Sequence, residues 1–204
     1  MNEACLVIVF AKAPVPGLAK TRLARTIGFE AAAHLAGTML THTVASALDS
    51  GIGPVELCCA PDTTHEKFQM VAVGAAVSFS EQGGGDLGDR MARAFTRGLD
   101  QYRRVVLIGT DAPLLDACVL RQAADALVAH DVVIAPAVDG GYVLVGLSRH
   151  ASEIFQDIEW STSRVMAQTR ARIASLGLSF QELPTMHDID EPEDLVHLPA
   201  GWLA

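Results

Sequence analysis

The sequence predicts an α/β protein of three layers, with a mostly parallel central sheet covered by helices on both faces. Three observations lead to this fold class. β-rich apolar segments alternate with helical segments, which is the pattern of parallel βαβ units. The strand segments are almost unbroken apolar runs, as expected of strands buried on both faces. A chain of 204 residues can also bury about 70% of its surface without disulfide or metal staples.

Seven segments are predicted as strands because they are apolar and rich in β-branched residues: Leu6–Phe10, Val55–Ala60, Ala76–Ser80, Arg104–Ile108, Val132–Ala137, Tyr142–Leu147 and Ser179–Leu183. Asp139-Gly140-Gly141 lies between the fifth and the sixth of them. Asp-Gly is a strong hairpin signal, so this pair of strands is expected to be antiparallel. No linker or internal repeat interrupts the pattern, and residues 1–204 are expected to form one domain.

The intervening helices are predicted at Phe29–Leu48, from Pro61-Asp62 onward, and at Asp89–Leu99, Leu115–Ala129, Ser163–Leu176 and Pro192–Leu198. Residues Ala31–Leu48 carry no formal charge, a length that could cross a membrane. However, His34, Thr38, Thr41 and His42 form one polar stripe. The segment is therefore interpreted as an amphipathic helix, and no membrane association is expected.

The composition excludes several classes of protein. With 15 Lys and Arg against 24 Asp and Glu, the net charge is −9, which argues against a general nucleic-acid binder. A content of 50% hydrophobic and 19% charged residues excludes a disordered acidic chain. The four cysteines form no Cys-x-x-Cys pair and are expected to be buried free thiols in a cytoplasmic protein. The apolar run Ala4–Phe10 is too short, and lacks the basic flank, for a secretory signal.

The charges are distributed unevenly along the chain. Between Glu3 and Glu30 there are four cations and no acid, and after Arg172 there is no Lys or Arg. If the basic beginning and the acidic end meet in the fold, they would form an anion clamp beside a cation site. The alternative is that both are solvated loops.

The loop after the first strand carries Ala11, Lys12, Gly17, Lys20 and Arg22. Gly17 lets backbone N–H groups approach an anion closely, and the cations supply positive charge. A following helix N-terminus would add its dipole, so a polyphosphate is the favoured ligand. The alternative is a surface loop with scattered cations.

A second loop, Gln82-Gly-Gly-Gly-Asp-Leu-Gly88, follows the third strand. Its glycines, among them Gly85 and Gly88, would let a base or a phosphate pack against the backbone. Gln82 could donate and accept hydrogen bonds in the plane of a base. A loop that is merely flexible is an equal alternative.

Asp111 directly follows the fourth strand, where a carboxylate could hold Mg²⁺ together with phosphate oxygens. The alternative is a turn or N-cap residue before Pro113. The loops after the first, third and fourth strands should lie at one edge of the sheet, beyond the carboxyl ends of the strands. Ligands of such folds bind at that edge.

Two further segments could border the same cleft. Asp139, Gly140 and Gly141 form a hairpin turn and could also leave space for an acceptor. Residues 160–163, which include Thr162, are first of all a helix start and secondly a possible phosphate contact.

Near the C-terminus, Asp188 and Asp190 alternate with Ile189, so both carboxylates would face one way in an extended segment. Asp190 is a candidate second metal ligand, with Asp188 as the alternate. Asp190 followed by Glu193 also has the spacing of a capping box, so it could be only a helix cap.

Taken in order, these motifs resemble the nucleotide-diphospho-sugar transferase superfamily with the GT-A fold, which is Rossmann-like. The specific parts are Ala-Lys-Thr-Arg-Leu, Gly-Asp-Leu-Gly, Thr-Asp-Ala-Pro-Leu, Asp-Gly-Gly-Tyr and Asp-Ile-Asp-Glu-Pro-Glu-Asp-Leu. The chain is most similar to small glycosyltransferase-like proteins, some linked to arsenosugar biosynthesis. It is also similar to molybdopterin and phospholactate guanylyltransferases, although their Gly-Gly-x-Ser loop is absent.

The resemblance implies a role for each motif. Lys20 and Arg22 would bind phosphate, and Gln82, Gly85 and Gly88 would contact the base. Asp111 and Asp190 would be the metal ligands, with Mg²⁺ or Mn²⁺ as the cofactor. Lys20, Arg22 and Asp111 are thus the expected catalytic residues, and Glu191 stands where the family often has Thr.

Three functions remain open from the sequence. The first is a Mg²⁺-dependent nucleotidyltransferase that acts on an NTP and a small phosphorylated acceptor and releases pyrophosphate. The second is a glycosyltransferase that uses a nucleotide-diphospho-sugar. The third is a non-catalytic nucleotide-binding module. The cation cluster before the first helix suits the β and γ groups of a triphosphate, and a homodimer is a possible assembly.

Overall fold

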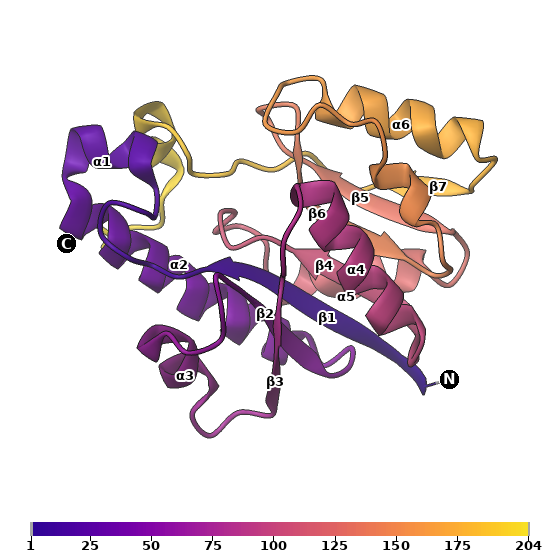
Figure 1. Ribbon diagram of the computed structural model, residues 1–204, viewed down its shortest axis with the longest axis horizontal. Helices are drawn as coiled ribbons and strands as arrows, with labels where there is room; N and C mark the ends of the chain where they lie inside the picture. The colour runs from indigo at the N-terminus through magenta and orange to yellow at the C-terminus, as the bar shows by residue number, and fades with distance from the viewer. Residues whose placement is uncertain (1, 204) are drawn as a thin grey trace.

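The computed structural model describes residues 2–203 and confirms the expected three-layer α/β/α architecture (Figure 1). Seven strands form one sheet in the order β3-β2-β1-β4-β6-β5-β7. Their bounds are β1 Asn2–Lys12, β2 Val55–Ala60, β3 Val77–Glu81, β4 Tyr102–Ile108, β5 Val132–Pro136, β6 Tyr142–Leu147 and β7 Phe180–Glu182. β6 runs antiparallel to β4 and β5, and the other neighbouring pairs are parallel. The predicted antiparallel hairpin is therefore confirmed.

The helices are α1 Thr21–Ile27, α2 Phe29–Ser50, α3 Glu66–Ala72, α4 Leu87–Leu99, α5 Ala117–Ala126 and α6 Val165–Ser175, with 3₁₀ turns η1 Ser152–Phe155 and η2 Pro192–His197. The turn η1 was not predicted from the sequence, and two of the α-helices differ from the prediction by more than three residues. α1 was not expected; it is separated from α2 by Gly28, whose φ of 88° breaks the helical path. The prediction of a helix from Pro61-Asp62 is wrong in its start, because α3 begins only after His65. The His65 ring nitrogen Nδ1 accepts a hydrogen bond from the Lys67 N–H at 3.2 Å and caps the helix.

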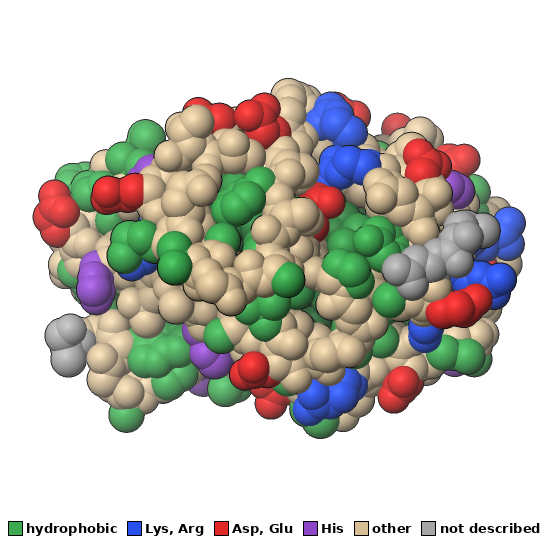
Figure 2. Space-filling model, turned by 90° about the horizontal axis from the view of Figure 1, so that it is seen from below, with side chains coloured by type: hydrophobic (Ala, Val, Ile, Leu, Met, Phe, Trp, Pro, Cys, Tyr) green, Lys and Arg blue, Asp and Glu red, His purple; other side chains and the backbone are tan. Residues whose placement is uncertain are grey.

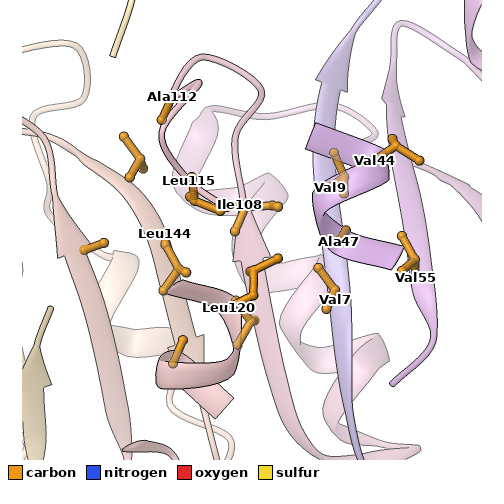
Figure 3. Packing of buried hydrophobic residues seen from close by; sticks show 14 of the residues in the cluster. Val7, Val9, Val44, Ala47, Val55, Ile108, Ala112, Leu115, Leu120 and Leu144 are labelled. Carbon is orange, nitrogen blue, oxygen red and sulfur yellow. The ribbon is translucent and has the colours of Figure 1, made fainter. Parts of the chain in front are cut away.

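β1 shows how the sheet divides the hydrophobic core into two layers. Its side chains alternate between the two faces, as in any strand. Val7 and Val9 face one side, where they join a cluster with α2, α3 and α5 (Figure 3). Leu6 and Ile8 face the other side, where they pack against α4, η1 and α6. Burying each such side chain stabilises the fold by about 1.5–3 kcal/mol, which explains the unbroken apolar sequence of the strand.

A third, smaller core joins the beginning of the chain to its end. Leu23 of α1 and Leu35 and Met39 of α2 surround Ile189, and all four side chains are buried. The segment after β7 crosses the molecule to reach them, as the yellow end of the ribbon shows in Figure 1. The basic beginning and the acidic end of the sequence therefore meet in the fold.

The surface charge and the long helix α2 can be compared with what the sequence predicted about nucleic-acid binding and membrane crossing. On the face shown in Figure 2, acidic and basic side chains are interspersed and do not form one basic patch. Among the helices of residues 2–203, none has the length and apolar character needed to cross a membrane. The cysteines are free thiols as expected, but Cys118 is exposed, so the expectation that all four are buried is wrong.

Candidate functional site

The carboxyl edge of the sheet gathers the motifs that the sequence singled out. β1, β4 and β5 end at this edge, and the loops that follow them carry Lys20, Asp111 and Asp139. β6 is antiparallel, so its first residue, Tyr142, lies at the same edge. Ligand sites of open α/β sheets lie beyond this edge, where several loops supply side chains to one place.

Lys20 lies at the centre of the site. Its ammonium group donates to the Asp111 carboxylate, to the Ile189 carbonyl at 2.6 Å and to Asp190 Oδ1 at 3.0 Å. The side chain is only 5% exposed. A lysine ammonium has three hydrogens, so these three acceptors use all of its hydrogen-bonding capacity.

The C-terminal segment is fastened to the sheet edge by backbone hydrogen bonds. The Met186 N–H donates to the Pro136 carbonyl at 2.8 Å, and the Ile189 N–H donates to the Asp111 carbonyl at 2.9 Å. Ile189 is fully buried in the third core. Because Asp188 and Asp190 flank this anchored residue, their backbone positions are fixed by the packing of Ile189.

The structure separates the two interpretations of Asp190. The capping box of η2 is formed by Glu191 and Asp194, whose carboxylate accepts from the Glu191 N–H at 2.7 Å. Asp190 is therefore not the helix cap, and its carboxylate binds Lys20. Arg22 reaches the same segment from the other side, through Glu191 Oε1 at 3.0 Å.

A cavity of about 430 Å³ opens over these groups. Its acidic side is formed by four carboxylates: Asp111, Asp139, Asp188 and Asp190. Arg22 and the segment of residues 160–163 form much of the rest of the wall. The cavity therefore brings together one cation, several hydroxyl groups and a concentrated negative charge.

The crowding of carboxylates shifts their pKa values. Burial, followed by the charge of Asp139, raises the pKa of Asp188 to about 6. Burial and the charge of Asp111 also raise the pKa of Asp190, against the opposing effect of Lys20. Burial by itself would lower the pKa of Lys20, but Asp111 and Asp190 reverse this, and the net shift is upward. The ammonium is therefore charged at neutral pH.

The donor set fits Mg²⁺ or Mn²⁺ on chemical grounds. Within residues 2–203, no three His, Cys, Asp or Glu side chains are grouped so as to hold a metal ion by themselves. Mg²⁺ is commonly bound through one or two carboxylates, with waters and substrate phosphates as its other ligands. Asp111 and Asp190 each turn one oxygen, Oδ1, toward Lys20. Their second oxygens are left for a cation, and Asp188 lies beside them on the same cavity.

The glycine-rich loop is held through its carbonyl groups. Arg93 donates to the carbonyls of Gln82 and, at 3.0 Å, of Gly84, and Arg90 Nε donates to the Gly85 carbonyl at 3.0 Å. Within the described residues, no hydrogen bond uses the backbone N–H groups of Gly83, Gly84 or Gly85. The loop thus offers donors and has its acceptors occupied, which suits an anionic or acceptor-rich ligand.

Leu87 of this loop lines the carboxylate cavity, whereas Gln82, Gly85 and Gly88 lie outside it. Gln82 is buried, and its amide nitrogen donates to the carbonyls of Ala11 and Cys58 at 3.2 and 3.1 Å. Gly85 has a φ of 93°, and a Cβ there would lie 2.5 Å from Asp89 Oδ2. A Cβ at Gly88 would lie 2.7 Å from the carbonyl oxygen of Phe155. Gln82 and Gly88 therefore have structural roles in closing the loop onto the sheet and η1.

The first loop contributes less free charge than its sequence indicates. Lys12 is exposed, and its ammonium donates to the Leu18 carbonyl of its own loop at 2.9 Å. Gly17 has a φ of 81° with open space beside it, and Ala11 is buried in the end of β1. Of the four cations in the basic beginning, Arg22 is the one that lines the cavity.

The hairpin turn that contains Gly140 is in contact with residues 160–163 at the wall of the cavity. A Cβ at Gly140 would lie 2.3 Å from the carbonyl oxygen of Ser163, so only glycine permits this contact. Gly141 and Thr162 line the cavity. The Thr162 hydroxyl donates to the Glu159 carbonyl at 2.8 Å, which orders the segment.

Arg90 and Arg93 were not singled out from the sequence, and Tyr142 and Trp160 belong to predicted motifs but were not named as site residues. Tyr142 and Trp160 pack edge to face, with ring centroids 6.4 Å apart, and form an aromatic wall of the cavity. Arg90 and Arg93 hold the glycine-rich loop. The two arginines are three residues apart and follow the loop directly, so both lie on one face of α4. This spacing is the sequence signal that could have identified them.

Comparison with known proteins gives the family and the fold of the chain. Residues 43–162 match a family model described as "Uncharacterized protein conserved in bacteria (DUF2064)". No curated protein matches the chain. A crystal structure from Desulfovibrio desulfuricans G20, provisionally described as a nucleotide-diphospho-sugar transferase, is 31% identical with a TM-score of 0.87. That match covers 95% of this chain and 85% of the other.

Two more distant structures share the fold. One is 4-diphosphocytidyl-2C-methyl-D-erythritol synthase from Anaerococcus prevotii DSM 20548, at 10% identity and a TM-score of 0.65, covering 96% of both chains. The other is the manganese complex of Rv0371c from Mycobacterium tuberculosis H37Rv, at 17% identity and a TM-score of 0.59, covering 96% of this chain and 97% of the other. The comparisons support the expected enzyme class, a transferase. The chain belongs to the DUF2064 family and has the GT-A-like fold of the nucleotide-diphospho-sugar transferases.

Proposed function

We propose that this chain is a Mg²⁺- or Mn²⁺-dependent nucleotidyltransferase that transfers a nucleotidyl group from an NTP to a small phosphorylated acceptor and releases pyrophosphate. One observation carries the proposal. Four aspartates and Arg22 surround a single cavity at the carboxyl edge of the sheet, between a loop rich in free N–H groups and a wall of hydroxyl side chains. Residues 1–204 would act as one domain, because all seven strands belong to the same sheet.

The nucleotide would lie along the glycine-rich loop. The N–H groups of Gly83, Gly84 and Gly85 have no partner within the described residues, and can donate to a base or a phosphate. Arg22 would exchange Glu191 for the phosphates that leave as pyrophosphate. An arginine suits this role because its guanidinium binds phosphate through two N–H groups at once. The exposed Arg22–Glu191 pair is inexpensive to break, since such pairs contribute about 0–1 kcal/mol.

The acceptor would bind on the opposite side, between Gly141, Thr162 and Asp139. Its phosphate oxygen attacks the α-phosphorus, the bond from the α-phosphorus to the β-phosphate bridging oxygen breaks, and pyrophosphate leaves with the electron pair. No side-chain nucleophile is needed, because positioning and electrostatic stabilisation supply most of the catalysis in such transfers.

Asp111 and Asp190 would hold the divalent cation, with Asp188 as an alternate ligand. A cation bound there would act as a Lewis acid on the phosphate oxygens of the nucleotide. The manganese complex of a protein with the same fold supports a divalent metal, although at 17% identity the likeness extends to the fold alone.

A glycosyltransferase is the second candidate. It is favoured by the description of the 31% identical structure as a nucleotide-diphospho-sugar transferase. The same carboxylates would then hold the diphosphate of the donor, and the sugar would be transferred in place of the nucleotidyl group.

Pyrophosphate release tests the proposal. The full chain is incubated with each NTP, a panel of sugar phosphates and other small phosphorylated acceptors, and MgCl₂. The expected result is pyrophosphate formation that requires one NTP, one class of acceptor and the cation. In parallel, the chain is incubated with nucleotide-diphospho-sugars and the same compounds, and donor consumption is followed.

The outcomes distinguish the candidates. Consumption of a nucleotide-sugar without any pyrophosphate would replace the proposal with glycosyl transfer. Binding of nucleotide, measured as a thermal shift, with no turnover of either donor would indicate a non-catalytic module.

A further inference from the structure

Lys20 and Arg22 are two residues apart and have opposite environments. The Lys20 side chain is 5% exposed and is bound by three acceptors, whereas that of Arg22 is 59% exposed and has one carboxylate partner. We propose that Lys20 is a positioning residue: a fixed internal cation that occupies the place between Asp111 and Asp190 and thereby weakens divalent-cation binding by this pair. The inference rests on one part of the proposed function, which is that Asp111 and Asp190 bind a divalent cation.

The acceptors of the Lys20 ammonium come from two separate segments. Asp111 comes from the end of β4 and Asp190 from the C-terminal segment, and both direct Oδ1 to the same nitrogen. The Ile189 carbonyl completes the set at 2.6 Å. Three oxygen ligands around one positive charge are also the surroundings that a divalent cation would receive. Lys20 therefore does the electrostatic work of a cation in keeping the two carboxylates together.

Lys20 has no free donor for a ligand. All three ammonium hydrogens are used within the protein. To bind a phosphate, the buried ammonium would have to release one of its three acceptors, because it has no further hydrogen to donate. Arg22 is accessible and lines the cavity. Arg22 is therefore the residue that would bind phosphate, and Lys20 is the residue that holds the two carboxylates in position.

The backbone of Lys20 also fits a fixed, positioning role. Its φ of 47° and ψ of 45° are left-handed, which is uncommon for a residue with a side chain. Such a conformation persists only where the surrounding structure holds it in place. The contacts of the Lys20 ammonium with β4 and with the C-terminal segment supply that constraint directly before α1.

A distinct consequence follows for metal binding. A cation that enters the site shares Asp111 and Asp190 with an ammonium that has already neutralised part of their charge. Removing the ammonium should therefore make metal binding tighter. If Lys20 acted only on nucleotide phosphates, its removal would leave the metal affinity of the nucleotide-free protein unchanged.

Mn²⁺ binding to the nucleotide-free full chain, measured by electron paramagnetic resonance, tests this. The variants are Lys20→Met and Lys20→Arg. The matched control is Lys12→Met, which removes an ammonium from the same loop that contacts a carbonyl and no carboxylate. We expect Lys20→Met to bind Mn²⁺ at least about tenfold more tightly than the wild type, because like charges a few ångströms apart repel strongly in a partly buried site. Lys20→Arg and Lys12→Met should stay within about threefold of the wild type, since the first keeps the charge and the second removes a distant one.

Thermal unfolding supplies the second readout. Without a divalent cation, Lys20→Met should melt at a lower temperature than the wild type, because Asp111 and Asp190 then repel each other. Mn²⁺ should raise its melting temperature by more than it raises that of the wild type. If the variant folds and binds Mn²⁺ no more tightly than the wild type, the inference is wrong. Failure to fold even in millimolar Mn²⁺ would also contradict it, since the cation could not replace Lys20.

Failure of this inference can be told apart from failure of the proposed function. If the wild type binds no Mn²⁺, or if Asp111→Asn leaves Mn²⁺ binding unchanged, the metal site itself is wrong and the proposed function fails with it. If Asp111→Asn abolishes Mn²⁺ binding but Lys20→Met does not tighten it, only the role of Lys20 is wrong.

Discussion

The loops after β1 and β3 differ in how the cationic side chains beside them are used. In the loop after β1, Lys20 binds carboxylates of other segments, and Lys12 binds a carbonyl of its own loop. In the loop after β3, Arg90 and Arg93 of α4 bind the loop carbonyls and leave glycine N–H groups free. The first loop is rich in charge but poor in free donors, and the second carries no cation but offers several donors.

This difference shows that a count of cations is a poor guide to an anion site. Hydrogen-bonding capacity that the protein itself uses is not available to a ligand. Under the proposed function, the glycine-rich loop and Arg22 would contact the nucleotide, and Lys20 would maintain the carboxylates that hold the metal. The following substitutions separate the two regions, from the largest expected effect to the smallest.

Gly85→Ala tests the glycine-rich loop most severely. Its φ of 93° is unfavourable for alanine, and a Cβ would lie 2.5 Å from Asp89 Oδ2. We expect at least a tenfold increase in the KM for nucleotide and a loss of about 1–3 kcal/mol in the free energy of unfolding. Gly177→Ala is the matched control, because Gly177 also has a positive φ of 64° but open space beside it. The control should lose stability without a change in KM; an equal rise in KM in both variants would contradict a specific role for the loop.

Arg93→Met removes the donor that holds the carbonyls of Gln82 and Gly84. The expected result is a KM for nucleotide raised by about tenfold with kcat nearly unchanged, because the interaction acts on binding and not on the transition state alone. Arg121→Met is a suitable control, since Arg121 also donates to two backbone carbonyls, those of Asp49 and Ser50. A fall in kcat at constant KM would show that the loop acts in the chemical step.

Asp188→Asn tests the acidic region through pH. The pKa of Asp188 is raised from 3.8 to about 6 in the folded protein, so between these values the folded state binds more protons than the unfolded state. The wild type therefore loses stability as pH rises through this range, and the loss is complete above pH 6. Allowing for partial exposure, Asp188→Asn should be more stable by about 1 kcal/mol at pH 8, with no gain below pH 4.

Urea unfolding at several pH values checks this prediction. Asp131→Asn serves as a control of opposite sign, because hydrogen bonds from Ser179 lower the pKa of Asp131. Its contribution is present at neutral pH and is lost as pH falls, so Asp131→Asn should destabilise the protein at pH 8. A loss of stability in Asp188→Asn at pH 8 would contradict the assignment of Asp188 to a crowded acidic site.

Glu191→Gln should have the smallest effect. Glu191 pairs with Arg22 at 3.0 Å, and both side chains are about half exposed. We expect a change in stability within about 0.5 kcal/mol, as is usual for exposed ion pairs. Arg22 would be released for phosphate, so the KM for nucleotide should fall by about twofold to threefold. A rise in KM would show that Glu191 holds Arg22 in its binding position.

The sheet and its order of helices could be predicted because both faces are buried. The alternation of Val7 and Ile8 between two cores requires an apolar residue at every position of β1. The break at Gly28 was missed, since Gly is tolerated in many helices and only its φ of 88° separates α1 from α2. The start of α3 was missed because His65 caps it through a ring nitrogen, which is not among the common N-cap signals.

The site was predicted at the level of segments more than of individual roles. The predicted capping box of Asp190 and Glu193 does not form; Glu191 and Asp194, which have the same spacing one residue later, form it instead. Gln82 follows the end of an edge strand, where its amide is needed to close the loop onto β1 and β2. Such competition between a ligand and the protein's own backbone depends on three-dimensional contacts that no spacing reveals.

The most direct test of the account is Mn²⁺ binding by the full chain with Asp111→Asn, with and without a nucleoside triphosphate. Asp157→Asn is the matched control, because Asp157 is highly exposed and its left-handed backbone conformation, at a φ of 57°, is one that Asn also adopts. The account predicts that the wild type and Asp157→Asn bind Mn²⁺ equally, that nucleotide tightens this binding, and that Asp111→Asn weakens it by at least about tenfold. Mn²⁺ binding by Asp111→Asn that matches the wild type, with or without nucleotide, would contradict a metal site at the end of β4.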